Sequence, residues 1–353
     1  MSRIERRYFG RLVDGTEVEA IDLIGDAGVS ATILTYGATL QALRAPDRWG
    51  VEADVLLGFD TLDGYLQDGA YQGATVGRYA NRIAGAQFTH AGAAYRLSAN
   101  EGPNCLHGGA CGWNRALWSV ARLGPTADGG VEVLLSHVSP DGDQGFPGEV
   151  WVEAGFLLDG ARLTLSYRAT THAPTPINLT SHGYFNLEGG DASVLDHRLV
   201  LHADAFLAVD ARRIPMAPQP VADTPFDFRQ AKALGDQIAV AHPQLVQAGG
   251  YDHCYVLQGA RDVGLPVAEL TAPRSGRRLK IGTTEPGVQL YTGNVLGPAP
   301  TGKGGRLYGP RHGVCVETQN LPDAPNRTDF PNCILKPGDV YESQTWLEFD
   351  VTP

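Results

Sequence analysis

Three polar segments of this 353-residue chain carry the residue types that acid–base chemistry needs. His182 lies in Asn-Leu-Thr-Ser-His-Gly-Tyr-Phe-Asn-Leu, His107 lies in Asn-Cys-Leu-His-Gly-Gly, and Glu317 begins Glu-Thr-Gln-Asn-Leu-Pro-Asp-Ala-Pro-Asn. A histidine can gain or lose a proton near neutral pH, and a carboxylate can act as a base. The surrounding amides, glycines and aromatic rings are typical of a sugar-binding cleft. Two histidines and a carboxylate that converge on one small polyol would perform acid–base chemistry without a cofactor.

Further polar groups interrupt the sequence at other points. Asn81 and Arg82 lie in Gly-Arg-Tyr-Ala-Asn-Arg-Ile, where a guanidinium with five fixed donors can hold sugar hydroxyls or a developing oxyanion. Asp252 lies at the start of a predicted strand. Gln289 and Tyr291 stand two residues apart on another, so they share one face of that strand. These residues are candidates for sugar binding.

Each candidate also has a structural interpretation when it is taken alone. A lone histidine is more often a hydrogen-bonded structural group than a catalyst, and Glu317 alone would fit a solvated strand end. Arg82, like Arg78 in the same segment, could form an ion pair with a surface carboxylate. Tyr291 would suit a hydrophobic core almost as well as the apolar face of a pyranose. The functional interpretation therefore depends on the segments lying together.

Alternating apolar and polar residues predict strands along most of the chain. The runs 150–158 and 163–170 are joined through Asp159-Gly160, the signal for a two-residue hairpin turn. A second hairpin is predicted over 87–97, with its turn near residues 91–92, and a strand over 345–351. Similar runs, also predicted to be strands, cover 29–43, 54–59, 131–138, 198–209, 251–257, 267–271 and 277–282.

Helical signals are few, which decides the fold class. Residues 228–241 could form one short helix, broken by Gly235, and residues 61–66 could form a turn or two. Strands without intervening helices rule out a parallel βαβ sheet and favour an all-β fold, a large antiparallel β-sandwich. The chain shows no fixed repeat and no low-complexity linker. We therefore expect a single domain over residues 1–353, with a mobile loop at 297–305.

Composition excludes several classes of partner and chemistry. The net charge of −11 argues against nucleic acid or an anionic membrane as partner, and no apolar run approaches the roughly 20 residues of a membrane span. No signal peptide is visible, and five cysteines without a C-x-x-C pair indicate free thiols in a reducing, cytoplasmic compartment. Phosphate-loop, dinucleotide-binding, zinc-protease and serine-hydrolase motifs are missing from the sequence, so we expect neither a cofactor nor a metal.

The order of the polar segments along the chain resembles that of the aldose 1-epimerase (galactose mutarotase) family. The resemblance rests on the segments at 77–83, 104–109, 178–187, 251–254, 284–294 and 317–326, and it covers essentially the whole chain. It implies a large antiparallel β-sandwich with an open sugar-binding cleft, acting on a small aldose and using no cofactor. The sequence leaves open whether the protein is a monomer or a homodimer.

The resemblance also implies a role for each candidate residue. Glu317 would be the general base and His182 the general acid of mutarotation, the opening and reclosure of a cyclic hemiacetal. Asn81, Arg82, His107, Asp252 and Gln289 would bind and orient the sugar, and Tyr291 would line the cleft. Unperturbed pKa values of about 4.3 for Glu and about 6.5 for His allow a carboxylate beside a partly protonated imidazole near neutral pH.

Alternative functions remain at this point. A related enzyme acting on hexose 6-phosphates would need extra cations around the cleft, and the acidic composition counts against it. A catalytically silent carbohydrate-binding or sensing domain would not need both His182 and Glu317. A glycosidase would need two suitably separated carboxylates, for which only Glu317 and Asp252 suggest themselves. The sequence does not select among galactose, glucose, xylose and arabinose.

Overall fold

The predicted hairpin over residues 150–170 forms the centre of the largest sheet. In the computed structural model, which describes residues 2–190, 192–258 and 263–352, strands β13 (Val150–Asp159) and β14 (Arg162–Thr171) pair from Val150↔Thr171 to Asp159↔Arg162. Apolar side chains at alternate positions of both strands are buried. This two-residue period turns one face of the hairpin to the core and the other to solvent.

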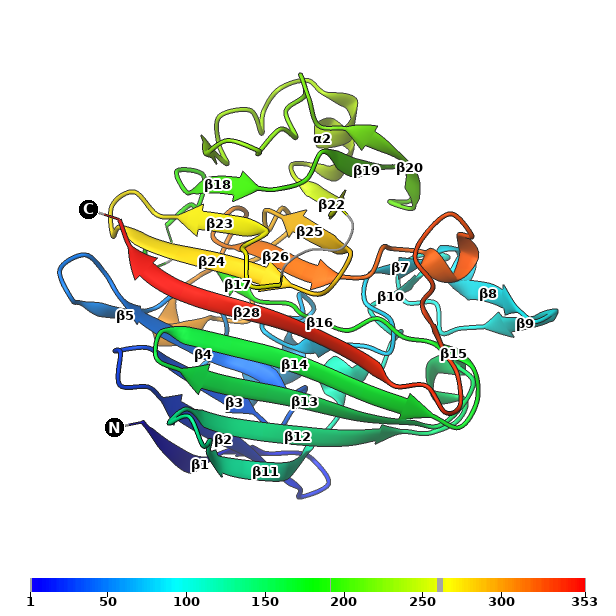
Figure 1. Cartoon of the computed structure of the whole chain (residues 1–353), viewed down its shortest axis with the longest axis horizontal. Coiled ribbons are helices and arrows are strands. Elements are labelled where there is room, and N and C mark those ends of the chain that lie inside the picture. Colours follow the sequence, from blue (N-terminus) through cyan, green and yellow to red (C-terminus); the bar gives the residue numbers. More distant parts are fainter. Residues whose placement is uncertain (1, 191, 259–262, 353) are drawn as a thin grey trace.

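The largest sheet extends on both sides of this hairpin. The C-terminal strand β28 (Tyr341–Val351), red in Figure 1, lies between β14 and β24 (Arg277–Thr283), so the end of the chain completes the middle of the sheet. The remaining strands follow in the order β11 (Ser119–Pro125), β12 (Val131–Ser139), β13, β14, β28 (Tyr341–Val351), β24 (Arg277–Thr283), β23 (Ala268–Thr271), β18 (Arg198–Leu201) and β21 (Lys232–Ala233).

Two further sheets complete the main architecture. One has the order β1 (Arg3–Arg11), β2 (Glu17–Ile24), β3 (Ser30–Leu34), β4 (Thr39–Pro46) and β5 (Glu52–Asp54). The other has the order β17 (Tyr184–Phe185), β26 (Val314–Gln319), β25 (Gly287–Tyr291), β22 (Asp252–Val256), β19 (Ala205–Val209) and β20 (Pro215–Pro220). Both sheets, like the largest one, pair their strands antiparallel.

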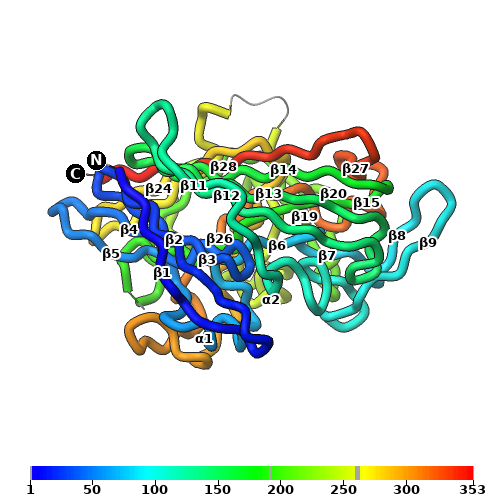
Figure 2. Tube along the Cα trace, turned by 90° about the horizontal axis from the view of Figure 1, so that it is seen from below, coloured from blue at the N-terminus to red at the C-terminus, as the bar shows by residue number. Residues whose placement is uncertain are grey.

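Short elements connect these sheets. The hairpin of β8 (Gln87–His90) and β9 (Ala93–Arg96) projects from one end of the molecule in both views (Figures 1 and 2). The short strand pairs are β7 (Arg82–Ile83) with β10 (Cys105–Leu106), β6 (Thr75–Val76) with β16 (Thr180–Ser181), β8 (Gln87–His90) with β9 (Ala93–Arg96), and β15 (Thr175–Pro176) with β27 (Ile334–Leu335). The helices are α1 (Leu62–Gln67) and α2 (Pro243–Ala248), with 3₁₀ turns η1 (Ala84–Ala86), η2 (Trp113–Arg115), η3 (Asp143–Gly145), η4 (Lys303–Gly305) and η5 (Ala324–Asn326).

One hydrophobic core joins the three main sheets. The same cluster of buried side chains includes Leu23 of β2, Phe156 of β13, Leu279 of β24 and Val316 of β26. The faces that meet in this core are the apolar faces of alternating strands, which is the packing of a β-sandwich. The expected all-β, antiparallel class is therefore confirmed. No helix in the described part of the chain is long and apolar enough to cross a membrane.

Most of the predicted strands are present, and two predictions need correction. Residues 228–241 form no helix: Phe228 and Leu234 are buried in the core, and the short strand β21 pairs with β18 instead. The run 54–59 is largely irregular, because only its first residue belongs to β5. The loop 297–305, predicted to be mobile, carries a buried anchor. The Lys303 ammonium donates hydrogen bonds to Asp54 Oδ2 (2.8 Å) and to the carbonyl oxygens of Leu56 (3.1 Å) and Gln41.

Candidate active site

Three neighbouring strands of the third sheet place polar side chains on one face. Glu317 of β26 lies opposite Gln289 of β25 in the ladder, and Gln289 Nε2 donates a 2.7 Å hydrogen bond to Asp252 Oδ1 of β22. The intervening residues Val316 and Leu290 point the other way, into the core. The period of two thus builds a polar face on strands whose opposite face is apolar. Glu317 lies inside its strand and is buried, so the alternative interpretation as a solvated glutamate at a strand end is wrong.

The two histidines come from short strands that cross toward this face. His107 follows β10, and its backbone N–H donates to the Asn81 carbonyl (3.1 Å). His182 follows β16, where its backbone N–H donates to the Ala74 carbonyl (2.9 Å) and its own carbonyl accepts from the Gly73 N–H (2.9 Å). These backbone bonds tie both histidines to neighbouring segments of the chain.

All eight residues predicted from the sequence line one cavity of about 460 Å³. The structure brings together side chains that are as far apart in sequence as Asn81 and Glu317. These residues are Asn81, Arg82, His107, His182, Asp252, Gln289, Tyr291 and Glu317. Arg78, the alternative to Arg82, lies outside this cavity: its guanidinium donates to the carbonyls of Pro147 and Gly148 (2.9 and 2.8 Å). Convergence in one cavity is what the functional interpretation required, and the individual roles stay predictions.

His182 and Glu317 form a close buried pair. His182 Nε2 lies 3.7 Å from Glu317 Oε2, and the two residues are 4% and 2% exposed. Within the described residues, Glu317 Oε2 and Gln289 Oε1 are buried oxygens without a hydrogen-bond donor. Buried acceptors are normally satisfied, so these two atoms indicate a ligand that brings hydroxyl donors into the cavity.

Burial opposes charge on both members of this pair. It raises the pKa of Glu317 well above its ordinary value, and Asp252 adds to this shift while Arg82 opposes it. Burial also lowers the pKa of His182 to about 4, against an opposing hydrogen bond to backbone. Burial therefore favours the uncharged form of each group, unlike the carboxylate–imidazolium pair expected from unperturbed values. The reason is desolvation, which the sequence did not reveal.

The second histidine is held as a neutral hydrogen-bond donor. The Asn81 backbone N–H donates to His107 Nδ1 (3.2 Å), so Nδ1 carries the lone pair and Nε2 carries the proton. Burial, together with His182 and Arg82, lowers the pKa of His107 well below its ordinary value. His107 can therefore donate a hydrogen bond to a sugar oxygen, but it is a poor proton source.

The same tautomer bears on metal binding. Donor atoms of His107, His182 and Glu317 lie within 4.8 Å of one another, a grouping that could surround a metal ion. A metal on His107 Nε2 would have to replace the proton there while Nδ1 accepts from the Asn81 N–H. The chemistry of this imidazole therefore disfavours a resident metal at the cluster.

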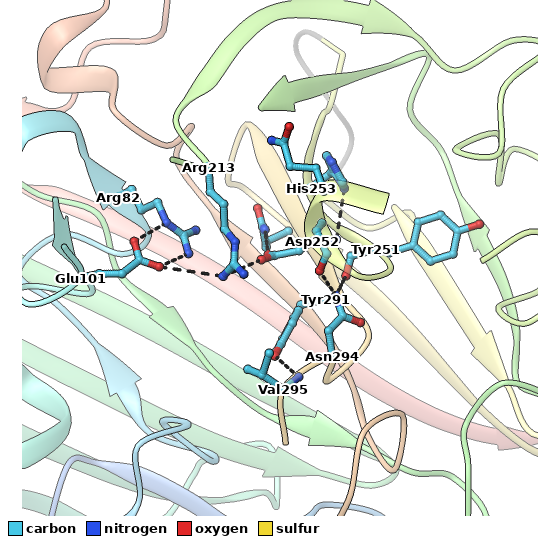
Figure 3. Close-up of polar contacts among 12 residues, drawn as sticks. Arg82, Glu101, Arg213, Tyr251, Asp252, His253, Tyr291, Asn294 and Val295 are labelled. Atoms are coloured by element: carbon cyan, nitrogen blue, oxygen red, sulfur yellow. Dashed lines mark hydrogen bonds and ion pairs between the residues drawn. The ribbon is translucent and has the colours of Figure 1, made fainter. Parts of the chain in front are cut away.

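A row of alternating charges forms another wall of the cavity. Arg82 Nε and Nη2 donate to the two carboxylate oxygens of Glu101 at 2.7 and 2.6 Å. Arg213 Nη1 lies 3.9 Å from Glu101 Oε1 and 3.9 Å from Asp252 Oδ2. Figure 3 shows Arg82, Glu101, Arg213 and Asp252 linked in this order. The row places two cations against two carboxylates, so this wall carries no surplus positive charge.

Sequence reasoning missed several residues of the cavity. Glu101 lies in the polar stretch just before His107 but was not selected, and Arg213 lies in the short charged segment 210–213 between two strands, which was not selected either. Tyr71 was also missed, although its ring centroid is 4.6 Å from that of His107 and 5.9 Å from that of His182. Nothing in the sequence near residues 71 or 213 signals these contacts, because they arise only from the tertiary fold.

Comparison with known proteins agrees with this fold and cavity. The sequence profile of the family described as aldose 1-epimerase matches residues 19–348. The galactose mutarotase of Bos taurus is 44% identical over 99% of this chain and 100% of that protein. The aldose 1-epimerase of Escherichia coli K12 is 37% identical over 95% of this chain and 96% of that protein.

Solved structures show the same relationship. A galactose 1-epimerase from Lactobacillus acidophilus superposes with a TM-score of 0.88 at 28% identity and covers all of both chains. An aldose epimerase homologue from C. elegans superposes with a TM-score of 0.86 at 33% identity, covering 95% of this chain and 99% of that one. This chain therefore belongs to the aldose 1-epimerase family of isomerases.

Proposed function

We propose that this protein interconverts the α and β anomers of free aldoses by opening and reclosing the sugar ring. The observation that carries the proposal is the buried pair of His182 and Glu317, whose facing atoms are 3.7 Å apart. The anomeric carbon of an aldose carries two oxygens, the C1 hydroxyl and the ring oxygen. A proton acceptor and a proton donor at this separation, in a cavity lined by hydrogen-bonding groups, suit proton transfer at both oxygens in one step.

The ring opens by two coupled proton transfers. Glu317, as carboxylate, takes the proton from the C1 hydroxyl, and the electron pair of that O–H bond forms the C1 carbonyl. The C1–O5 bond breaks, and O5 takes the proton from His182 Nε2. Rotation about C1–C2 then presents the other face of the aldehyde, and the reverse transfers close the other anomer. Because protons and electrons return to their starting groups, no net oxidant, reductant or cofactor is needed.

The buried environment favours the product of ring opening. Before this step the pair holds a carboxylate and an imidazolium, and after it the pair holds a carboxylic acid and a neutral imidazole. Burial raises the pKa of Glu317 and lowers the pKa of His182, which stabilises this second arrangement. Interactions that are stronger in the transition state than in the ground state accelerate the chemical step, and the charges of both groups are already partly neutralised in this transition state. Desolvation thus favours the proton transfers from the carboxylate–imidazolium state, which the pair first reaches by moving its one proton from Glu317 to His182.

Other residues of the cavity hold the open-chain sugar so that it recloses as a ring. Asp252, Gln289 and Arg82 offer acceptors and donors to sugar hydroxyls, and His107 Nε2 donates a hydrogen bond. Asn81 Oδ1 accepts from the Arg82 backbone N–H (2.9 Å), which holds the amide at the cavity wall. Tyr291 would line the apolar face of the sugar. Such positioning keeps the reacting groups close together while the ring is open.

The charges of the cavity favour a neutral sugar over a sugar phosphate. Arg82 and Arg213 face Glu101 and Asp252, and Glu317 lies in the same cavity. A phosphate would need cations that are not already paired with carboxylates. The hexose 6-phosphate alternative therefore has no support from the described residues of this wall.

Polarimetry of freshly dissolved α-D-galactose and α-D-glucose tests the proposed function. The protein is expected to accelerate the approach of each sugar to its equilibrium rotation, in proportion to protein concentration. Glucose 6-phosphate serves as the comparison substrate and is expected to react far more slowly. No acceleration with either free sugar would contradict the proposal, and faster reaction of the phosphorylated sugar would favour the alternative.

The dependence of the rate on pH follows from the shifted pKa values. The active state of the His182–Glu317 pair carries a single proton. When the pair takes up a second proton, both groups are protonated and Glu317 can no longer act as a base. Since the pKa of His182 is lowered to about 4, kcat/KM is expected to persist below pH 6.5 and to fall as the pH drops through about 4. Initial rates corrected for spontaneous mutarotation, with circular dichroism at each pH, measure this. An acid midpoint near 6.5 would show that His182 has an ordinary pKa.

A further inference from the structure

The hairpin β19–β20 places an arginine in a backbone conformation that arginine disfavours. Arg213 has a φ of 61°, in the left-handed region where a side chain crowds the backbone and glycine is preferred. The turn itself is well bonded: Asp210 Oδ1 accepts from the backbone N–H groups of Arg212 (2.8 Å) and Ile214 (2.9 Å). Arg213 N–H donates to the Asp210 carbonyl (2.8 Å). The turn could therefore form with glycine at 213 at lower cost.

The guanidinium of Arg213 makes no direct hydrogen bond to a described residue that would offset the strain of this left-handed backbone conformation. Its Nη1 lies 3.9 Å from Glu101 Oε1 and 3.9 Å from Asp252 Oδ2, which is too long for a hydrogen bond. Arg82, by contrast, donates two short bonds to the same Glu101. Among the residues that the structure describes, the only polar contacts of the Arg213 side chain are these two ion pairs (Figure 3).

The space between Arg213 and the carboxylates of Glu101 and Asp252 is suited to binding a hydroxyl group. A hydroxyl oxygen accepts a bond from a guanidinium while its hydrogen donates to a carboxylate, so one hydroxyl can satisfy Arg213 and Asp252 together. The Arg213 side chain is 36% exposed, whereas those of His182 and Glu317 are 6% and 3% exposed. Arg213 therefore lies toward the cavity mouth, away from the proposed reacting pair.

We propose that Arg213 binds hydroxyl groups of the aldose that are remote from C1. This inference rests on the proposed function, because it takes the anomeric carbon to lie at His182 and Glu317. The hydroxyl lies between the guanidinium and the carboxylates of Glu101 and Asp252, which hold Arg213 in place and balance its charge. A neutral polyol is the ligand class that fits, since an anion would meet both carboxylates.

Arg213→Gly is the test, because it removes the side chain and also relieves the left-handed backbone. We expect KM for galactose to rise about tenfold, the loss of a hydrogen bond to a charged group, while kcat changes less than about twofold. The melting temperature is expected to stay the same or to rise. A side chain with a purely structural role would give the opposite pattern, a lower melting temperature and an unchanged KM.

The neighbouring Arg212→Ala supplies a matched control. Its side chain lies outside the cavity, with Nη2 3.6 Å from Asp210 Oδ2, and is 62% exposed. This variant is expected to keep the wild-type KM. An unchanged KM in Arg213→Gly overturns the inference, whatever the melting temperature. If the wild-type protein itself does not accelerate mutarotation, the proposed function fails instead, so the two failures are distinguishable.

Discussion

Glu317→Gln is expected to lower kcat/KM for galactose by about 10³-fold. A positioned general base contributes about 10²–10⁴-fold, and the amide has no basic oxygen able to take the C1 proton. The loss should lie in kcat more than in KM, because the amide keeps the shape of the side chain and its contact with the sugar. Glu317 is 2% exposed and Oε2 has no donor among the described residues, so an uncharged amide at this position is not expected to destabilise the fold.

The Glu317→Gln variant should therefore be as stable as the wild-type protein, or more stable. Glu132→Gln is a matched control, because Glu132 lies on β12 in a surface ion pair with Arg122 (2.7 Å). The control should retain full activity. Polarimetry measures the activity of both variants, and thermal unfolding measures their stability. Full activity in Glu317→Gln would remove Glu317 from the mechanism.

His182→Asn is expected to lower kcat/KM by about 10²–10³-fold, because O5 then loses its proton donor. The fold should persist. With its pKa lowered to about 4, His182 is uncharged at neutral pH, so its removal leaves no buried charge without a partner. Because the two groups act on one hemiacetal, Glu317→Gln combined with His182→Asn should be little slower than Glu317→Gln alone.

Strict additivity of these two losses would contradict concerted action by His182 and Glu317. His90→Asn, on the projecting hairpin β8–β9, is the control for histidine loss outside the cavity and should leave the rate unchanged. Anomer exchange measured by nuclear magnetic resonance gives the rates of the wild-type protein, the two single variants, the double variant and the control on the same sugar. The comparison separates loss of the acid from a general loss of fold.

The sequence predicted the strands where alternation is strong and failed where tertiary packing decides. The hairpin 150–170 was predictable because its apolar residues repeat every second position up to Asp159-Gly160. The segment 228–241 was wrongly predicted to be helical, since Phe228 and Leu234 serve a sheet core rather than a helix face. Strand β1 was missed because its sequence is rich in arginine and most of its residues are exposed.

The cavity divides in a similar way. The eight predicted residues lie in polar segments whose composition already stood out, and the resemblance to a family assigned their roles. Arg213 and Tyr71 reach the cavity from turns in which their backbone φ angles are positive, 61° and 58° respectively. No local sequence pattern predicts these turns. The protonation of His182 and Glu317 was likewise hidden, because pKa shifts of this kind depend on how deeply the folded chain buries each group.

A sugar-bound structure of the Glu317→Gln variant with galactose tests the central claim most directly. The account predicts that the introduced amide contacts the C1 hydroxyl oxygen while His182 Nε2 contacts the ring oxygen, each within hydrogen-bond distance. A galactose whose anomeric carbon lies away from both side chains, or a sugar that meets them through one oxygen only, would contradict it.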